Sequence, residues 1–297
     1  MRVKCVLLFS GGLDSTLAGM LLAEIGVDVY PFKITTPFLA SKKDTRTKLL
    51  EERLQRKVYV YKVGMDYIKL ILNPKHGYGK GLNPCVDCKI YMFKKAKQYM
   101  EEINADFIAT GEVLNQRPMS QRGWQMRIIE KEAEVDGYVL RPLCAKVLKE
   151  TILEKQGLVD RDKLLDISGR QRVRQIELAR KYKIDDVSIS GGCLLTDKNY
   201  IERFKNLINH FADFTVEDVE LLRYGRHFYV DGTKIIVGRN EYENEIIKGY
   251  YSQEKHLIIS DDIGPTVLGY RNKDLAEEKI MELMLKYFKK YARRISD

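Results

Sequence analysis

The sequence predicts an α/β protein whose parallel sheet carries helices on both faces, followed by a smaller α+β domain. In the first part, short β-rich apolar runs alternate with helical patterns from residue 4 to residue 110. In addition, VKCVLLFSGGLDSTLAGMLLAEIG runs an apolar strand directly into a helix. Such a βαβα order gives parallel strands, because each helix returns the chain to the end of the sheet where it began. A change of pattern near residue 198 predicts the second domain.

The strands and helices of the first part are expected to alternate, except that two helices joined by a Gly- and Pro-rich loop precede the fourth strand. Strands are predicted at 4–9, 27–34, 58–63 and 106–110. Helices are predicted at 15–25, 42–55, 66–72 and 85–103, and the loop at 73–84. The pattern is less regular over 113–192, where we expect a short strand at 138–140 and a helix at 170–182.

The last hundred residues have a different pattern. Helices are expected at 200–211 and 216–222, followed by a hairpin in which Asp231-Gly232 joins HFYV to KIIVG. A closing helix is predicted from apolar residues spaced three and four apart: Ala276, Ile280, Leu283, Met284, Tyr287, Phe288 and Tyr291. We therefore divide the chain into domains 1–197 and 198–297.

Composition limits where the protein works and what it binds. No apolar run approaches the ~20 residues of a membrane helix, and Met1 leads into a strand with no signal peptide, so a cytoplasmic protein without membrane contact is expected. Five cysteines, an odd number, argue against a disulfide framework. Net charge is +9, but residues 198–297 are neutral, with 17 Lys and Arg and 17 Asp and Glu. An anionic partner should therefore bind mainly through residues 1–197.

The hinge between the first strand and helix has the composition of a phosphate site. Ligands of open parallel sheets lie at the carboxyl ends of strands, where a helix start points free N–H groups outward. Gly11 and Gly12 allow a phosphate close to the backbone, and Ser10, Ser15 and Thr16 add hydroxyl groups. Asp14 next to phosphates is expected to hold Mg²⁺. No Gly-Lys-Ser/Thr follows, so this is not a Walker loop.

Three cysteines are candidates for metal or sulfur chemistry. Cys85 and Cys88 form a C-x-x-C at the start of a helix, where the helix dipole favours thiolates, and Cys193 follows Gly-Gly in an expected exposed turn. Three thiolates suit a 4Fe–4S cluster with one open iron, or Zn²⁺ with a fourth ligand. Alternatively, two of them carry sulfur as a persulfide. Cys5, inside the first strand, and Cys144 are expected to be structural.

SGGLDS resembles the signature of the PP-loop ATP pyrophosphatases, whose fold is of the adenine nucleotide alpha hydrolase type. That family splits ATP between the α- and β-phosphates and transfers AMP to a carbonyl oxygen. NPCVDC and ADFIATGEVLNQRPMSQ are similar to segments of tRNA 2-thiouridylases and 4-thiouridine synthetases, and SGGCLLTD to the later cysteine segment of a close subgroup. The resemblance covers residues 1 to about 197. It implies that the A-T-G strand end, with Gly111, lies across the ATP site, and that adenine lies near Phe32–Ile34.

The resemblance implies an ATP-dependent tRNA sulfurtransferase. A uridine carbonyl would be adenylated and its oxygen replaced by sulfur, with Cys85, Cys88 and Cys193 holding an iron–sulfur cluster and Asp14 holding magnesium. The sulfur would come from sulfide or a persulfide carrier. Two other functions stay open: an adenylating ligase or amidotransferase acting on a small molecule, and a non-catalytic RNA-binding sulfur-delivery protein.

RNA contacts are expected on both domains. LLRYGRHFYVDGTKIIVGRNEYENEII resembles the NFACT-R module of translation-associated proteins, which implies RNA binding by residues 198–297. Trp124 and Tyr78 are candidates for stacking on a flipped base. The arginines expected to contact RNA are Arg117, Arg122, Arg170, Arg172, Arg174 and Arg239.

Overall fold

The computed structural model divides the chain into two compact units, Met1–Thr196 and Asp197–Asp297. It describes residues 2–39, 45–188, 192–230, 232–251, 255–258, 265–270, 281–282 and 286. In this part of the chain no helix is both long and apolar enough to cross a bilayer. Each unit is described by itself.

The first unit contains a five-stranded parallel sheet, as predicted. Its strands, in the spatial order β3-β2-β1-β4-β5, are β3 (Tyr59–Lys62), β2 (Asp28–Thr35), β1 (Lys4–Leu8), β4 (Phe107–Thr110) and β5 (Val139–Leu140). The strand at the centre, β1, pairs with β2 through Leu8 and Phe32, and with β4 through Leu8 and Thr110. The carboxyl ends of β1, β2 and β4 therefore meet at one edge of the sheet.

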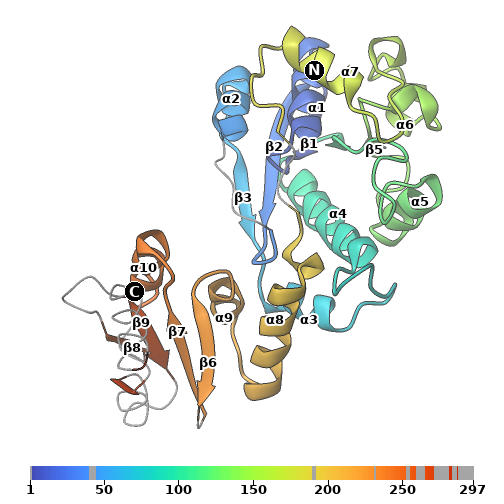
Figure 1. The fold of residues 1–297 in the computed structure, drawn as a ribbon. Coiled ribbons are helices and arrows are strands. Elements are labelled where there is room, and N and C mark those ends of the chain that lie inside the picture. The colour runs from blue at the N-terminus through green and yellow to red at the C-terminus, as the bar shows by residue number, and fades with distance from the viewer. Residues whose placement is uncertain are drawn as a thin grey trace. The chain divides into compact units, whose positions relative to one another are not determined.

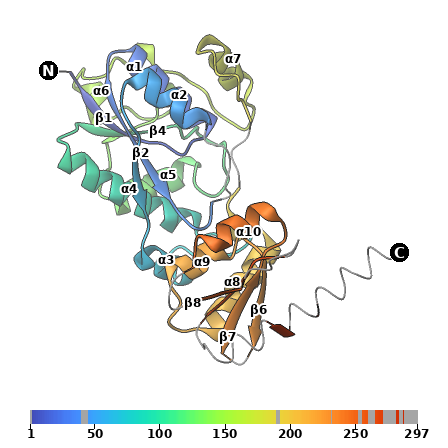
Figure 2. The same cartoon turned by 90° about the vertical axis from the view of Figure 1, so that its left-hand side faces the viewer.

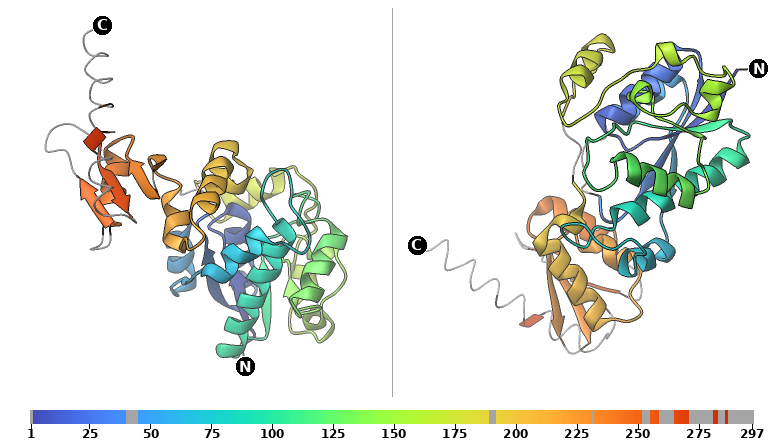
Figure 3. Two further views of the ribbon diagram at one scale, coloured as in Figure 1. Left: turned by 90° about the horizontal axis from the view of Figure 1, so that it is seen from below. Right: turned by 90° about the vertical axis from the view of Figure 1, so that its right-hand side faces the viewer.

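Helices cover both faces of this sheet (Figure 1). One face carries α1 (Leu13–Glu24), α2 (Thr45–Leu54) and α7 (Val173–Lys181), with α1 beside α2 (Figure 2) and beside α7 (Figure 3, right). The other face carries α4 (Cys85–Glu102) and α5 (Gly123–Glu132), and α3 (Met65–Leu72) packs on α4. Short helical turns complete the unit: α6 (Ile152–Lys155), η1 (Ala145–Val147), η2 (Arg161–Lys163) and η3 (Leu194–Thr196).

Helix α1 is buried around almost its whole circumference because it lies between the sheet, α2 and α7. Leu17 and Leu22 are fully buried in the core that also holds Leu7 and Ala179. Gly19 allows this close packing, since a Cβ there would lie 2.7 Å from Leu7 Cδ2. The buried α1 places its first turn firmly at the carboxyl edge of the sheet.

The second unit is an α+β fold with an antiparallel sheet. Helices α8 (Lys198–His210) and α9 (Val216–Leu221) precede β6 (Arg226–Val230) and β7 (Thr233–Val237), which pair in the predicted hairpin. They are followed by α10 (Glu241–Lys248), β8 (Lys255–Ile258) and β9 (Val267–Tyr270), and the strand order is β6-β7-β9-β8. The predicted closing helix falls almost wholly outside the described residues, and so does Asp231 of the turn.

The end of β4 touches the first turn of α1 without any intervening side chain. Gly111 follows the last residue of β4, and a Cβ placed on it would lie 2.4 Å from the Asp14 carbonyl carbon and 2.4 Å from the Ser15 nitrogen. Only glycine allows this separation, because real Cβ atoms do not approach backbone so closely. The strand end and the β1–α1 turn are thereby held against each other.

The next residue, Glu112, is the centre of a buried ion network. Its side chain is only 5% exposed, and its two oxygens lie 3.0 Å from Lys89 Nζ and 3.2 Å from Arg141 Nε. Arg141 also pairs with Glu130 of α5, and the Cys144 thiol donates to the Glu112 carbonyl at 3.3 Å. Burial acts to raise the pKa of Glu112, but the charges of Lys89 and Arg141 outweigh it and lower that pKa. The carboxylate thus stays charged in the core.

Replacing Gly111 with alanine should destabilise the first unit. The added methyl group has no free space against the backbone of Asp14 and Ser15, and overpacking of this kind costs about 1–3 kcal/mol of the free energy of unfolding. Urea denaturation followed by circular dichroism measures the change. Gly123→Ala is the matched control, because a Cβ there meets only Leu114 Cδ1 at 3.8 Å. Equal urea midpoints for the two variants would contradict the close approach.

Replacing Glu112 with glutamine should lower the free energy of unfolding at pH 7 by roughly 3–5 kcal/mol, because it leaves Lys89 without its buried partner. The folded-state pKa of Glu112 is lowered, so its stabilising effect is complete above the unfolded value of 4.5 and is lost as pH falls through the folded value. The stability gap between wild type and Glu112→Gln should therefore shrink below about pH 4.5. An equal difference in the free energy of unfolding at pH 3.5 and at pH 7 would contradict an ionised Glu112 in the folded protein.

Candidate active site

Hydroxyl groups fix the turn between β1 and α1 from within. Ser15 Oγ and Thr16 Oγ1 both donate to the Gly12 carbonyl, at 2.9 and 3.0 Å, and the Gly12 N–H donates to Ser10 Oγ at 3.3 Å. Gly11 has a φ of 73°, in the left-handed region that favours glycine. The turn is therefore preformed before any ligand binds.

The same turn presents unpaired donors at the start of α1. The first N–H groups of a helix have no partner within it, and the N-cap residue, Gly12, has no side chain to accept from them. These groups lie at the positive end of the helix dipole, an arrangement that favours the binding of an anion. Thr16 differs from the expectation, since it is fully buried and its hydroxyl bonds to Gly12, so it braces the turn.

Asp14, in the first turn of α1, is held by side chains distant in sequence. Gln116 Nε2 donates to Asp14 Oδ2 at 2.7 Å, and Gln175 Nε2 of α7 donates to Gln116 Oε1 at 3.1 Å. Arg172 Nη2 lies 3.8 Å from Asp14 Oδ1. Sequence reasoning missed both glutamines, although Gln116 stands within the LNQRPMSQ segment. This chain of contacts orients a carboxylate beside the anion site.

The end of β2 has open backbone groups next to this turn. The Phe32 carbonyl accepts from Phe9 N–H on the β1 side at 2.9 Å, and the Thr35 carbonyl accepts from Val63 N–H on the β3 side at 3.2 Å. Backbone groups alternate in direction along a strand, so Ile34 points its N–H and C=O past the end of β1. The Phe32 side chain is 1% exposed and packs on Tyr99, so it is not open to a ligand.

Cys85 and Cys88 share the first turn of α4, as the sequence predicts. Asn83 Nδ2 donates to Cys85 Sγ at 3.1 Å. The Tyr67 hydroxyl of α3 lies 2.9 Å from Cys88 Sγ, and Tyr67 is itself buried. Burial raises the pKa of Cys88, so at neutral pH it carries its proton.

Cys193 is brought to this pair by backbone contacts with two distant segments. It forms an antiparallel bridge with Leu39, and the carbonyl of Leu195 accepts from Leu82 N–H at 2.9 Å. Burial raises the pKa of the Cys193 thiol to about 11, and the neighbouring Cys88 and Cys85 contribute to this rise. Three thiols are therefore gathered in the first unit, whereas Cys5 and Cys144 are buried in its core.

The three thiols have the donor chemistry of an iron–sulfur or zinc site, since both take cysteine sulfur. Among the described residues, however, no group of three or more His, Cys, Asp or Glu side chains has the arrangement of a formed metal centre. Cys88 Sγ is instead in contact with Tyr67 and Cys85 Sγ with Asn83. A metal would therefore displace thiol protons as it draws the sulfurs together.

Arg46 of α2 connects the turn Ser10–Ser15, called the phosphate turn after the role that its composition predicts, to the segment that leads towards Cys193. It is 5% exposed, and its Nη1 donates to the Gly11 carbonyl at 3.0 Å. Its Nε donates to the Asp186 carbonyl at 2.9 Å and its Nη2 to the Ser188 carbonyl at 2.6 Å. One buried guanidinium thus ties together two segments of the first unit.

The arginines expected to contact RNA have different environments. Arg117, Arg122 and Arg170 are exposed. Arg174 pairs with Asp166, and Arg172 lies at Asp14. Arg239, in the second unit, is an ion-pair partner of Glu243. Two candidate stacking residues also differ, because Trp124 is 53% exposed whereas the Tyr78 hydroxyl donates to the carbonyls of α3.

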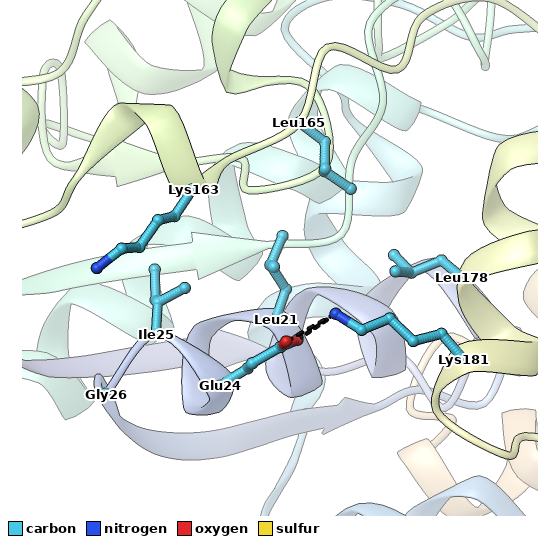
Figure 4. A pocket seen from close by; sticks show the side chains of 8 residues that line it. All are labelled: Leu21, Glu24, Ile25, Gly26, Lys163, Leu165, Leu178 and Lys181. Carbon is cyan, nitrogen blue, oxygen red and sulfur yellow. Dashed lines mark hydrogen bonds and ion pairs between the residues drawn. The ribbon is translucent and has the colours of Figure 1, made fainter.

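A shallow hollow of about 550 Å³ lies at the other end of α1, around Gly26 (Figure 4). Leu21, Leu165 and Leu178 form apolar walls, and Lys181 pairs with Glu24. A helix of 12 residues separates it from the phosphate turn, which corresponds to roughly 18 Å. It is therefore distinct from the site at the carboxyl edge of the sheet.

Comparison with known proteins identifies two regions of the chain. Residues 1–158 match the family described as thiamine biosynthesis protein (ThiI), and residues 225–294 match the NFACT protein RNA binding domain. A protein of Thermococcus kodakarensis named "Probable tRNA sulfurtransferase" is 30% identical over 162 residues. The alignment covers 53% of this chain and 39% of that protein.

Two further similarities extend over more of the chain. The tRNA-specific 2-thiouridylase MnmA of Clostridium acetobutylicum is 28% identical, with 96% of this chain and 84% of that protein aligned. A 4-thiouridine synthetase solved in complex with RNA and bound ATP has a TM-score of 0.43 and 21% identity, and the superposition covers 73% of this chain and 52% of the synthetase chain.

The ThiI match spans more than half of the 297 residues. It contains the phosphate turn, Asp14, Gly111 and the Cys85–Cys88 pair. This protein therefore belongs to the ThiI family.

Proposed function

We propose that this protein is an ATP-dependent tRNA-uridine sulfurtransferase of the PP-loop type. One observation carries the proposal: the preformed phosphate turn and the gathered thiols belong to one compact unit and are joined by buried contacts. Gly111 touches the turn, and Glu112 pairs with Lys89, which follows Cys88. Nucleotide activation and sulfur chemistry would then occur side by side, which favours a two-step transfer.

In the proposed complex, MgATP binds at the carboxyl edge of the sheet. The triphosphate lies on Ser10–Ser15, where the start of α1 supplies free N–H groups. Asp14 would hold the magnesium ion, because Gln116 donates to its Oδ2 and leaves its Oδ1 without a hydrogen-bond partner among the described residues. The backbone of Ile34 reads the edge of adenine, and Gly111 lies next to the nucleotide while it holds the end of β4 against the turn.

The chemistry replaces a carbon–oxygen bond with a carbon–sulfur bond. The uridine carbonyl oxygen attacks the α-phosphorus, pyrophosphate leaves, and the base becomes adenylated. Hydrosulfide then adds to the activated carbon. Free sulfide supplies it directly, whereas a persulfide carrier supplies it when a thiol attacks the inner sulfur, forms a disulfide and releases hydrosulfide. AMP departs with the original oxygen and one proton is released. The leaving ability of AMP makes the second step possible.

Cys85, Cys88 and Cys193 would hold a 4Fe–4S cluster, whose remaining iron supplies a binding position for hydrosulfide. The support is the donor chemistry and the mutual electrostatic influence of the thiols. The chain's own contribution would be to hold Cys88 through Tyr67 and Cys85 through Asn83 before metal is loaded. Zinc bound by the same three cysteines is the alternative, and elemental analysis would distinguish it from an iron–sulfur cluster.

tRNA is the proposed macromolecular substrate. Exposed Arg117, Arg122 and Arg170 could neutralise phosphates, and exposed Trp124 offers a ring on which a base could stack. The second unit is proposed to add RNA contacts, because residues 225–294 match an RNA-binding domain. Arg239 is less suited to that role than expected, since Glu243 neutralises it.

Asp14→Asn should abolish the first step. The amide cannot hold magnesium as a carboxylate does, so tRNA-dependent release of pyrophosphate from ATP should fall by about 100-fold or more. Asp166→Asn is the matched control, because Asp166 is exposed and pairs with Arg174. A coupled pyrophosphate assay with tRNA measures both. Wild-type rates in Asp14→Asn would remove the proposed magnesium site.

Serine at Cys85, Cys88 or Cys193 should separate the two steps. Each variant should lose thiouridine formation, measured by nucleoside mass spectrometry, and keep ATP-dependent pyrophosphate release near the wild-type rate. Cys144→Ser is the control, since that thiol lies in the core. After anaerobic reconstitution, wild type and control should absorb at about 400 nm and bind iron, and the three variants should not. Thiouridine formed at wild-type levels by Cys193→Ser would contradict a three-thiol site.

A further inference from the structure

Arg172 stands out because it is the cation that faces Asp14. It is the N-cap residue of α7, and its Nη2 lies 3.8 Å from Asp14 Oδ1. Its side chain is 21% exposed, compared with 51% for Arg174 two residues later. An arginine that binds an RNA backbone over an open surface would not need to be partly buried against the phosphate turn.

Several polar atoms around Arg172 are buried and make no hydrogen bond in the part of the chain that the structure describes. Within the described residues, Arg172 Nε, Asp14 Oδ1 and Gln175 Oε1 have no hydrogen bond, and Gln175 is fully buried. Buried polar atoms normally find partners, because leaving one unpaired costs about 1–3 kcal/mol. Three such atoms in one connected group indicate a site that a polar ligand completes.

The phosphate turn needs a positive charge that it does not itself contain. Residues Ser10–Ser15 include no Lys or Arg. Arg46 touches the turn, but its guanidinium is already bonded to Gly11, Asp186 and Ser188. ATP carries several negative charges, and arginine is well suited to bind phosphate oxygens with two parallel hydrogen bonds. Arg172 can supply that charge.

The start of α7 is held in place by its own packing. Ala179 is fully buried in the core that surrounds α1, and Leu178 packs against it. Gln175, one turn after Arg172, reaches Gln116 and through it Asp14. These contacts fix the distance between the first turn of α1 and the guanidinium.

We infer that Arg172 is a ligand of the ATP triphosphate, positioned by the Gln175–Gln116–Asp14 chain, and not a contact to tRNA. When magnesium occupies Asp14, the guanidinium exchanges its long contact with that carboxylate for phosphate oxygens. It then stabilises the negative charge of the departing pyrophosphate. This inference rests on the proposed ATP site and assigns a residue to it.

Binding of α,β-methylene-ATP with Mg²⁺, measured by titration calorimetry, tests the inference without requiring turnover. Arg172→Gln should weaken binding by about 10- to 100-fold, as expected for the loss of charged hydrogen bonds. Arg174→Gln, on the same helix but paired with Asp166, should bind as wild type does. Filter binding of an unmodified tRNA transcript should give similar affinity for Arg172→Gln and wild type.

A second measurement uses the wild-type protein and does not depend on the folding of a variant. Phenylglyoxal modification mapped by mass spectrometry should be slowed at Arg172, and not at Arg174, when the ATP analogue and Mg²⁺ are present. Weakened tRNA binding with unchanged nucleotide binding in Arg172→Gln, or equal labelling of Arg172 with and without the analogue, would overturn the assignment. If wild type binds no analogue at all, the proposed ATP site itself fails.

Discussion

The buried carboxylate of Glu112 is the interaction on which the arrangement of the site depends. A charge in the core is tolerated only when opposite charges compensate it, and here Lys89 and Arg141 do so from two directions. Lys89 follows Cys88 on α4, and Glu112 follows Gly111 at the end of β4. The thiol-bearing turn and the phosphate turn are therefore held at a fixed separation by an electrostatic requirement, in addition to apolar packing.

The two centres in the first unit have opposite character. The phosphate turn is preorganised: its hydroxyl groups are satisfied internally, and its free N–H groups point outward before ligand arrives. The three thiols of Cys85, Cys88 and Cys193 are not arranged for a metal. Burial keeps Cys88 and Cys193 protonated, and two of the three sulfurs have other hydrogen-bond partners. Under the proposed reaction, nucleotide binding needs little rearrangement, whereas metal loading involves proton release and movement of side chains.

Much of the fold could be predicted because its signals are local. The strand-to-helix transition at SGGLDS, the alternation up to Thr110 and the Asp-Gly hairpin each depend on neighbouring residues only. Helix α5 was missed because it follows a polar segment and buries a narrow face, chiefly Met126 and Ile129. The partners of Asp14 could not be predicted, because Gln116 and Gln175 lie 59 residues apart and meet only after α7 packs on α1. The bridge between Leu39 and Cys193 is equally non-local, although the thiols themselves were recognisable as candidates.

The way Arg46 makes its contacts has a consequence for how this sequence can vary. Its hydrogen bonds to the Gly11, Asp186 and Ser188 carbonyls use main-chain oxygens, which every residue type has, but it also contacts Asp186 Oδ1 at 3.0 Å and Ser188 Oγ at 3.1 Å. The tether therefore has a backbone part, which does not depend on residue type, and a side-chain part, which depends on Asp186 and Ser188. Relatives that exchange those two residues would lose the ion pair or the hydroxyl contact and keep the backbone part of the linkage, provided that the arginine itself and the course of the chain are retained.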